Sequence, residues 1–520
     1  MNRTAAVLIK SAAWMTALSF LNKLLGVFLR LYVSARAGSA GMGLFTLVLS
    51  VYTLFSTFAT AGFTLAVSRL AAEKRDSGEA GARRITVCAC RAALLLSAAA
   101  CAAMLAFADP AAKTLLGDER CAAPLRVLAA SLPFMAFAAC LKGWLFSLRK
   151  GVVTAAASLL EQAVKTAVTA VMLGFVFAGT NDLGDMCLGM ALAITVSESA
   201  SCAFLFIKSA LWRKSCGKAG MPPRAARREL FSVAFPVALS VWITSLLHTA
   251  ESLLVPKVFA SYSGGSREYA LSQFGMIRGM VIPLLFFPFV FLASLISVFT
   301  PELSRLNLLA DRAPLRARVK LLTGAAAVFA FAAGGVFFAL PEYIGEAFYP
   351  GADTAGAVRI LALVTPFMYI ETVCDGVLKA VGEQKRTLGY TVLNSALRLA
   401  LIFTLVKRYG GEGYLWLLVV SNTFSYVLCR VRLWRVTGAG ANLLHGCVIP
   451  VLCAAGAGAA SRYALRFLAG KSCSVCAAAG TVVYAAVFAL LLLLFSGNRV
   501  RNAVSAFAKR GAERACGGSP

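Results

Sequence analysis

Long apolar runs separated by short polar segments dominate the sequence. A run of about 20 apolar residues is long enough to cross a bilayer as a helix. By this criterion the chain contains fourteen predicted spans, at 11–36, 43–68, 84–108, 124–148, 152–178, 185–210, 230–256, 274–300, 317–340, 355–380, 388–408, 412–433, 445–468 and 474–496. The pattern therefore predicts an all-α integral membrane protein.

The composition supports a membrane protein and argues against a nucleic acid-binding protein. The chain is 59% hydrophobic and 14% charged, whereas an average soluble domain is about 45–50% apolar and about 25% charged. Its net charge of +28 would indicate nucleic acid binding in a soluble protein. Here the basic residues fall in short loops between apolar runs, so we expect no nucleic acid partner.

Basic residues are divided unequally between alternate loops. The loops after the second, sixth and eighth predicted spans and the C-terminal tail are rich in Lys and Arg, whereas 180–185 and 341–354 contain neither. Loops rich in Lys and Arg lie on the cytoplasmic side of a membrane. This distribution predicts a membrane protein with both termini in the cytoplasm, and an even number of spans agrees with it.

The chain also contains an internal repeat. When residue n is placed over residue n+233, Arg126-Val-Leu-Ala matches Arg359-Ile-Leu-Ala and Pro133-Phe-Met matches Pro366-Phe-Met. We therefore expect two six-helix lobes, as in transporters that rock two bundles around a central site. The predicted divisions are lobes at 1–210 and 230–436, a cytoplasmic linker at 211–229, helices 13 and 14 at 437–496, and a basic tail at 497–520.

The first predicted span carries two basic residues inside an apolar run. Lys23 and Arg30 are seven residues apart, about two helical turns, and so share one face. A charge at the centre of a membrane helix costs about 2.5–3.5 kcal/mol. Two explanations remain open. Either Arg30 snorkels to the headgroups while Lys23 pairs with an acid on a neighbouring helix, or both line a water-filled cavity and attract an anion.

Other intramembrane charges are candidates for function by the same argument. Glu161 and Lys165 are four residues apart and form either a structural ion pair or part of a cavity charge network. Arg278, like the basic pair of the first span, has no obvious acid on its own helix, so we expect all three to bind an anion. The remaining charged or titratable candidates in the spans are Lys142, Glu198, His248, Glu251, Glu371, Asp375, Lys379 and Arg398. Of these, Glu251, Glu371 and Asp375 are candidates for holding a coupling cation or neutralising the empty cavity.

Metal, redox and nucleotide chemistry are not expected. The fifteen cysteines lie mostly in apolar runs, where a thiol behaves as a small hydrophobe. Cys473 and Cys476 have no second pair, and the sequence contains two histidines. Ala469-Gly-Lys-Ser resembles the end of a phosphate-binding loop, but Leu465 stands where that motif needs glycine. With no nucleophile–base motif either, we expect a protein without cofactor that is not an enzyme.

Several short motifs, in order and spacing, resemble those of one family. The motifs are Leu18 to Ala37, Gly41-Met-Gly-Leu, Ala61 to Glu73, Leu159-Leu-Glu-Gln-Ala-Val-Lys, Gly275 to Leu284 and Pro301-Glu-Leu-Ser. They resemble the stage V sporulation protein B branch of the polysaccharide and lipid II flippase family. That branch belongs to the multidrug/oligosaccharidyl-lipid/polysaccharide exporter superfamily.

The resemblance implies a fourteen-helix exporter of the bacterial cell membrane, with a cationic cavity and a groove for a lipid tail at helices 13 and 14. Its cargo would be an undecaprenyl-diphosphate-linked sugar, such as a peptidoglycan precursor, with membrane lipids and an optional coupling cation as further partners. The family's basic pair falls on Lys23 and Arg30, its helix 5 polar set on Glu161, Gln162 and Lys165, and its helix 7 acid on Glu251. The alternative is a multidrug cation antiporter, whose cargo the basic pair would repel.

Overall fold

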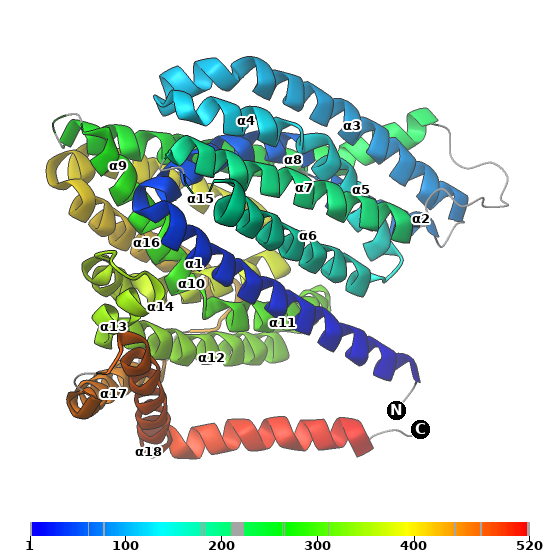
Figure 1. Ribbon diagram of the computed structural model, residues 1–520. Coiled ribbons are helices and arrows are strands. Elements are labelled where there is room, and N and C mark those ends of the chain that lie inside the picture. Colours follow the sequence, from blue (N-terminus) through cyan, green and yellow to red (C-terminus); the bar gives the residue numbers. More distant parts are fainter. Residues whose placement is uncertain are drawn as a thin grey trace. The chain divides into compact units, whose positions relative to one another are not determined.

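The computed structural model describes residues 3–60, 62–75, 79–177, 179, 182–209, 223–262, 264, 266–309, 311–440, 444–468 and 471–516. Within these ranges every regular element is a helix and none is a strand (Figure 1). The predicted all-α class is confirmed. Positions 211–222 of the predicted linker, the last four residues of the tail and the first two of Ala469-Gly-Lys-Ser lie outside the described residues.

The chain divides into two compact units. The first is Lys10–Gly279, and the second is Met280–Pro520 together with Met1–Ile9. The predicted lobe boundaries at 210 and 230 stay a prediction. The helices of the first unit are α1 (Arg3–Thr60), α2 (Phe63–Arg75), α3 (Glu79–Pro110), η1 (Ala111–Leu116), η2 (Glu119–Cys121), α4 (Ala122–Ala129), α5 (Leu132–Ser147), α6 (Gly151–Val171), η3 (Met172–Val176), α7 (Leu183–Ser209), α8 (Pro223–Tyr262), α9 (Arg267–Phe274) and most of η4 (Gly275–Val281).

In the first unit, α6 and α7 lie side by side, and α3 packs along α5 (Figure 1). Helix α1 bends at Gly38, whose φ of 63° is open to glycine without strain. Its N-terminal part follows α6, because the Tyr32 hydroxyl donates to the Ala170 carbonyl at 3.3 Å. A Cβ added to Gly26 would also lie 3.8 Å from Nε2 of Gln162. The basic pair of α1 is therefore carried beside the polar residues of α6.

The second unit contains α10 (Ile282–Phe286), α11 (Phe289–Leu308), α12 (Arg312–Ala339), α13 (Pro341–Phe348), α14 (Ala355–Ala380), α15 (Gln384–Leu401), η5 (Ile402–Val406), α16 (Lys407–Thr437), η6 (Leu444–Val448), α17 (Ile449–Leu465), η7 (Arg466–Leu468) and α18 (Cys473–Cys516). Its core is formed by apolar side chains of α11, α12, α14 and α16. Tyr369 is fully buried there, with Phe289 at 5.3 Å between ring centroids. Helix α17 packs against α18 (Figure 1).

The described residues include twelve helices long and apolar enough to cross a membrane, or thirteen if a bent pair counts as one span. The multi-pass class is confirmed, while the number fourteen stays a prediction. The difference has local causes. Two continuous helical stretches each cover two predicted spans, and each contains a glycine kink, at Gly38 and Gly410. The predicted span at 124–148 corresponds to the bent pair Glu119–Ala129 and Leu132–Ser147, which is outside the twelve. The predicted span at 274–300 instead contributes to two candidate spans, Arg267–Phe286 and Phe289–Leu308, divided near Pro288, because proline cannot donate the helical hydrogen bond.

The predicted repeat has a counterpart in each unit. Arg126 pairs with Asp109 in the first unit, and Arg359 pairs with Glu342 in the second. Both pairs join residues 17 positions apart, and the offset of 233 that aligns the arginines also aligns the acids. The repeat therefore includes an ion pair that the sequence comparison did not single out.

Candidate functional site

Lys23 and Arg30 both lie on the N-terminal part of α1 with exposed side chains. Lys23 forms no ion pair with any residue that the structure describes. Its predicted pairing with an acid of a neighbouring helix is therefore absent from the described part of the chain. That the two residues share an anion-binding cavity stays a prediction.

A cluster of four charged residues lies between α5, α6 and α7. Glu161 stands between two lysines, with Lys142 Nζ at 3.7 Å and Lys165 Nζ at 3.8 Å from its carboxylate oxygens. The predicted Glu161–Lys165 pair is thus present. These separations exceed the 2.7–2.9 Å of a close charge-assisted hydrogen bond, so the lysines are not locked to the acid. Glu198 of α7 completes the cluster and is 9% exposed.

Three of these four residues, Lys142, Glu161 and Glu198, line a cavity of about 300 Å³. It is lined by Thr60, Thr64, Met135, Ala139, Lys142, Glu161 and Glu198. Two carboxylates and two lysines sum to zero charge when all are ionised, so the empty cluster needs no external ion. The sequence placed Lys142 and Glu198 in membrane spans but gave no reason to join them to Glu161, because they come from three different helices.

Arg278 is not a solitary cation. Its Nη2 donates to Oε1 of Glu251 at 2.8 Å, and the Glu251 side chain is 2% exposed. His248 Nδ1 approaches the other carboxylate oxygen at 3.9 Å. Two predicted candidates on different helices, α8 and η4, are therefore one ion pair. Arg278 has its acidic partner on another helix, and spacing along one helix could not identify that partner.

Helix α1 and the broken helix that carries Arg278 touch backbone to backbone. A Cβ at Gly275 would lie 1.9 Å from the Ser39 carbonyl oxygen, and one at Gly43 would lie 2.1 Å from that of Leu271. The hydroxyls of Ser39 and Ser272 are hydrogen-bonded at 2.7 Å. Only glycine allows this approach, which fixes α9 and η4 against the kinked part of α1.

Two ion-pair clusters lie near the ends of α8. One joins the start of α8 to α2, and the other joins the residue at the start of α9, just beyond the end of α8, to Asp118. Near the start of α8, Glu229 pairs with Lys74 of α2 at 2.9 Å. Beyond the other end of α8, Arg267 donates to the Leu116 carbonyl at 2.6 Å and lies 3.5 Å from Asp118.

Asp118 is the centre of the second of these clusters. Burial opposes its ionisation, but hydrogen bonds from Arg120 and the charges of Arg120 and Arg267 outweigh that effect and hold the pKa of Asp118 below its ordinary value. Asp118 is therefore an anion between two arginines at neutral pH. Arg120 Nη1 also lies 3.9 Å from Asp182, which precedes α7.

In the second unit, two of the remaining candidates, Glu371 and Arg398, form hydrogen bonds to side chains of α16. Glu371 of α14 accepts a hydrogen bond from Ser425 at 3.0 Å. Arg398 of α15 donates to the Ser421 hydroxyl and to the Asn422 side chain, both at 3.1 Å. On α14, Asp375 pairs with Lys379 one turn away. Within the described residues, no three His, Cys, Asp or Glu side chains come together to hold a metal ion.

Solved structures of transporters share this fold. The chain is similar to a structure described as "Lipid II flippase MurJ, inward closed conformation", with a TM-score of 0.70, 12% identity, and coverage of 94% of this chain and 99% of that one. It is also similar to an inward-facing multidrug resistance MATE family transporter of the MOP superfamily, with a TM-score of 0.60, 16% identity, and coverage of 81% and 96%. The shared fold is that of an all-α multi-pass membrane protein, as the apolar pattern of the sequence predicts.

The sequence identifies the family within this class. The polysaccharide biosynthesis protein family matches residues 8–307, more than half of the chain, so the protein belongs to that family. Stage V sporulation protein B of Bacillus subtilis (strain 168) is 23% identical over 510 residues, which cover 94% of this chain and 95% of that protein. The resemblance noted from the sequence motifs is confirmed.

Proposed function

We propose that the protein is a flippase for an undecaprenyl-diphosphate-linked sugar, a peptidoglycan precursor or polysaccharide unit, which it moves from the cytoplasmic to the outer leaflet by alternating access. The observation that carries this proposal is the exposure of Lys23 and Arg30 on one face of α1, within an apolar run. Each charge costs about 2.5–3.5 kcal/mol at membrane depth. A bound diphosphate repays that cost, and the fork of Arg30 fits two phosphate oxygens at once.

Arg278 would be the third diphosphate contact. In the empty protein Glu251 neutralises it at 2.8 Å, and an arriving diphosphate would compete for the same guanidinium. The exchange replaces one anion by another, so Arg278 is never left as an uncompensated charge in the span. The Glu161 carboxylate is held loosely, with Lys142 Nζ at 3.7 Å and Lys165 Nζ at 3.8 Å. These three side chains can therefore also exchange partners when the charged cargo arrives.

The two ion-pair clusters at the ends of α8 are the proposed gates. With both termini cytoplasmic, Lys74 and Glu229 close the inner side, while Asp118 and Arg267 close the outer side. Alternating access then requires one cluster to open while the other stays closed. Each opening exchanges a short ion pair, 2.9 Å for the inner one, for hydration of both partners at the membrane surface, where such pairs contribute little net energy.

The membrane potential is the proposed driving force. A dianion that leaves a negative interior gains about 4.6 kcal/mol per 100 mV, twice the value for one charge. No nucleotide is then needed. Glu371 and Asp375 are candidates for holding a coupling cation on the return step, since Glu371 accepts from Ser425 at 3.0 Å and has a carboxylate oxygen left for another ligand.

The experiment is reconstitution of the purified protein in liposomes with fluorescent lipid II. Exposure of the lipid is followed with a membrane-impermeant quencher, with and without an imposed potential. We expect exposure to be faster when the compartment that the lipid leaves is negative. Equal rates at both polarities would contradict the proposed driving force, and no movement of lipid II or of other undecaprenyl-diphosphate sugars would contradict the proposed cargo.

One observation favours a second candidate, a multidrug cation antiporter. The 300 Å³ cavity is lined by two carboxylates, Glu161 and Glu198, which could attract a cationic drug. Lys142 in the same lining offsets part of that attraction. Uptake of a fluorescent cationic dye by the same liposomes under a proton or sodium gradient distinguishes the two candidates, and we expect none.

A further inference from the structure

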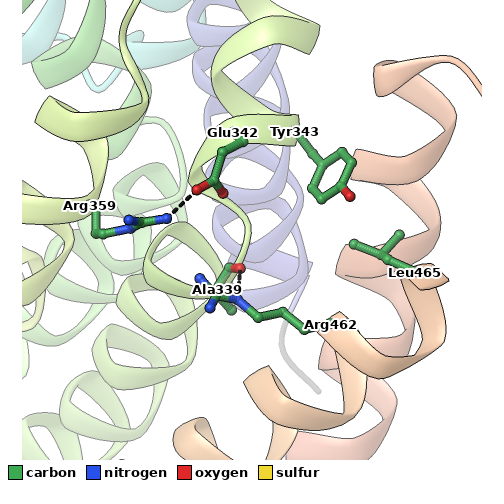
Figure 2. Close-up of a pocket in the computed structure, with 6 residues that line it drawn as sticks. All are labelled: Ala339, Glu342, Tyr343, Arg359, Arg462 and Leu465. Atoms are coloured by element: carbon green, nitrogen blue, oxygen red, sulfur yellow. Dashed lines mark hydrogen bonds and ion pairs between the residues drawn. The ribbon is translucent and has the colours of Figure 1, made fainter. Parts of the chain in front are cut away.

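A second cavity lies in the unit Met280–Pro520 and has no part in the proposed transport path. It has a volume of about 270 Å³ and is lined by Ala339, Glu342, Tyr343, Arg359, Arg462 and Leu465 (Figure 2). These residues come from the last residue of α12, from α13, from the first turns of α14 and from the last turn of α17. The cavity is therefore at the level where membrane helices end, which is the depth of the lipid headgroups.

The charge available in this cavity belongs to Arg462. Arg359 is already paired with Glu342 (Figure 2), and the repeat has the same pair, Arg126 with Asp109, in the first unit. That pair is thus a common feature of both repeats and is neutral. Arg462 donates Nε to the Ala339 carbonyl at 2.8 Å, which fixes the guanidinium at the cavity. Its two Nη groups make no hydrogen bond to the described residues, and they are the donors that fit a phosphate.

The surroundings indicate an amphipathic ligand. Tyr463 and Phe467, beside Arg462 on the end of α17 and on η7, are 61% and 78% exposed. Aromatic residues at helix ends mark the boundary between headgroups and acyl chains. Further along α17, Leu452 is 61% exposed. Apolar surface therefore runs from the polar cavity along the membrane-spanning part of the helix. The acyl chain of a lipid would contact this surface, whereas a soluble anion would not.

We propose that this cavity binds the headgroup phosphate of an anionic phospholipid, with Arg462 as its principal ligand and with the acyl chains along α17. With both termini cytoplasmic, the lipid belongs to the outer leaflet. The binding itself does not depend on the proposed flippase activity, because none of the six lining residues is among those proposed to bind the diphosphate or to form the gates.

Native mass spectrometry of the detergent-purified full chain, titrated with phosphatidylglycerol, phosphatidylcholine or inorganic phosphate, tests this site. We expect phosphatidylglycerol to bind more tightly than phosphatidylcholine, and inorganic phosphate to leave no adduct. Arg462→Gln should weaken phosphatidylglycerol binding about tenfold, which corresponds to about 1.4 kcal/mol. Equal retention of inorganic phosphate would overturn the lipid as ligand, and equal binding of both lipids would overturn the charge argument.

Two matched variants separate this site from general charge attraction and from misfolding. Arg466→Gln removes the same charge one turn away, from a side chain that lies 5.9 Å over the Tyr463 ring and does not line the cavity. It should leave binding unchanged, and a tenfold loss there would refute the site. Glu342→Gln releases Arg359 from its acid and should tighten phosphatidylglycerol binding severalfold. The expected gain in binding could not be explained by misfolding of the variant. Weaker binding of phosphatidylglycerol by Glu342→Gln would contradict the proposal.

Discussion

The ion pair between Glu251 and Arg278 permits a quantitative test. Glu251 is 2% exposed and Arg278 is 23% exposed, and their closest atoms are 2.8 Å apart. Removing one partner of a buried ion pair costs about 3–5 kcal/mol, because the other charge is left uncompensated. Since Arg278 keeps some access to water, we expect a cost at the lower end of this range. We expect Glu251→Gln to reduce the free energy of unfolding by about 3 kcal/mol.

The assay is equilibrium unfolding in mixed micelles with an increasing fraction of denaturing detergent. The matched control is Glu73→Gln, which breaks an ion pair whose side chains are 65% and 50% exposed and should cost less than about 0.5 kcal/mol. In a double-mutant cycle, Arg278→Met should cost much less in the Glu251→Gln background than alone. Additive effects, or a Glu251→Gln cost no larger than that of Glu73→Gln, would refute the reasoning.

Three further predictions concern packing, pH and the cavity. Gly275→Ala places a methyl group 1.9 Å from the Ser39 carbonyl and should destabilise the protein by at least about 1–3 kcal/mol in the same unfolding assay, whereas Gly389→Ala, with nothing within 4 Å, should be neutral or stabilising. The lowered pKa of Asp118 means that its carboxylate stabilises the fold above the unfolded-state pKa of about 3.9 and that this contribution is lost as the pH falls through the folded-state pKa. The Tm of Asp118→Asn should accordingly be lower than that of the wild type at pH 7, with a difference that shrinks below about pH 4; a constant difference would contradict the assignment. Glu161→Gln leaves Glu198 as the one carboxylate of the four-residue cluster against two lysines, and this excess positive charge should slow the return of the empty transporter in a lipid II exposure assay, visible as a normal first turnover followed by slower ones; an unchanged steady rate would exclude Glu161 from the cycle.

The sequence predicted what depends on local periodicity. Apolar runs define the membrane helices, and the Glu161–Lys165 pair follows from a spacing of four residues on one helix. The glycine kinks at Gly38 and Gly410 were not predicted, because a glycine within an apolar run does not reveal its φ. The break at Pro288 has a cause that can be read from the sequence, because a proline inside a span removes a helical hydrogen bond.

The sequence did not predict contacts made between helices. Arg278 and Glu251 are 27 residues apart and meet only because α8 and η4 are packed together. Glu198, which is 37 residues after Glu161 in the sequence, joins the cluster around Glu161 for the same reason. The repeat could have indicated one further pair. Once Arg126 is aligned with Arg359, the acids 17 positions earlier are aligned as well.

The most direct test of the proposed anion cavity is charge reversal on one face of α1. Arg30→Glu and Arg36→Glu make the same change on one helix, but six residues turn the helix by about 240°, so Arg36 projects from another face. In liposomes with fluorescent lipid II, we expect the wild type and Arg36→Glu to expose the lipid in the outer leaflet and Arg30→Glu to expose none. Transport by Arg30→Glu at the wild-type rate would contradict the account.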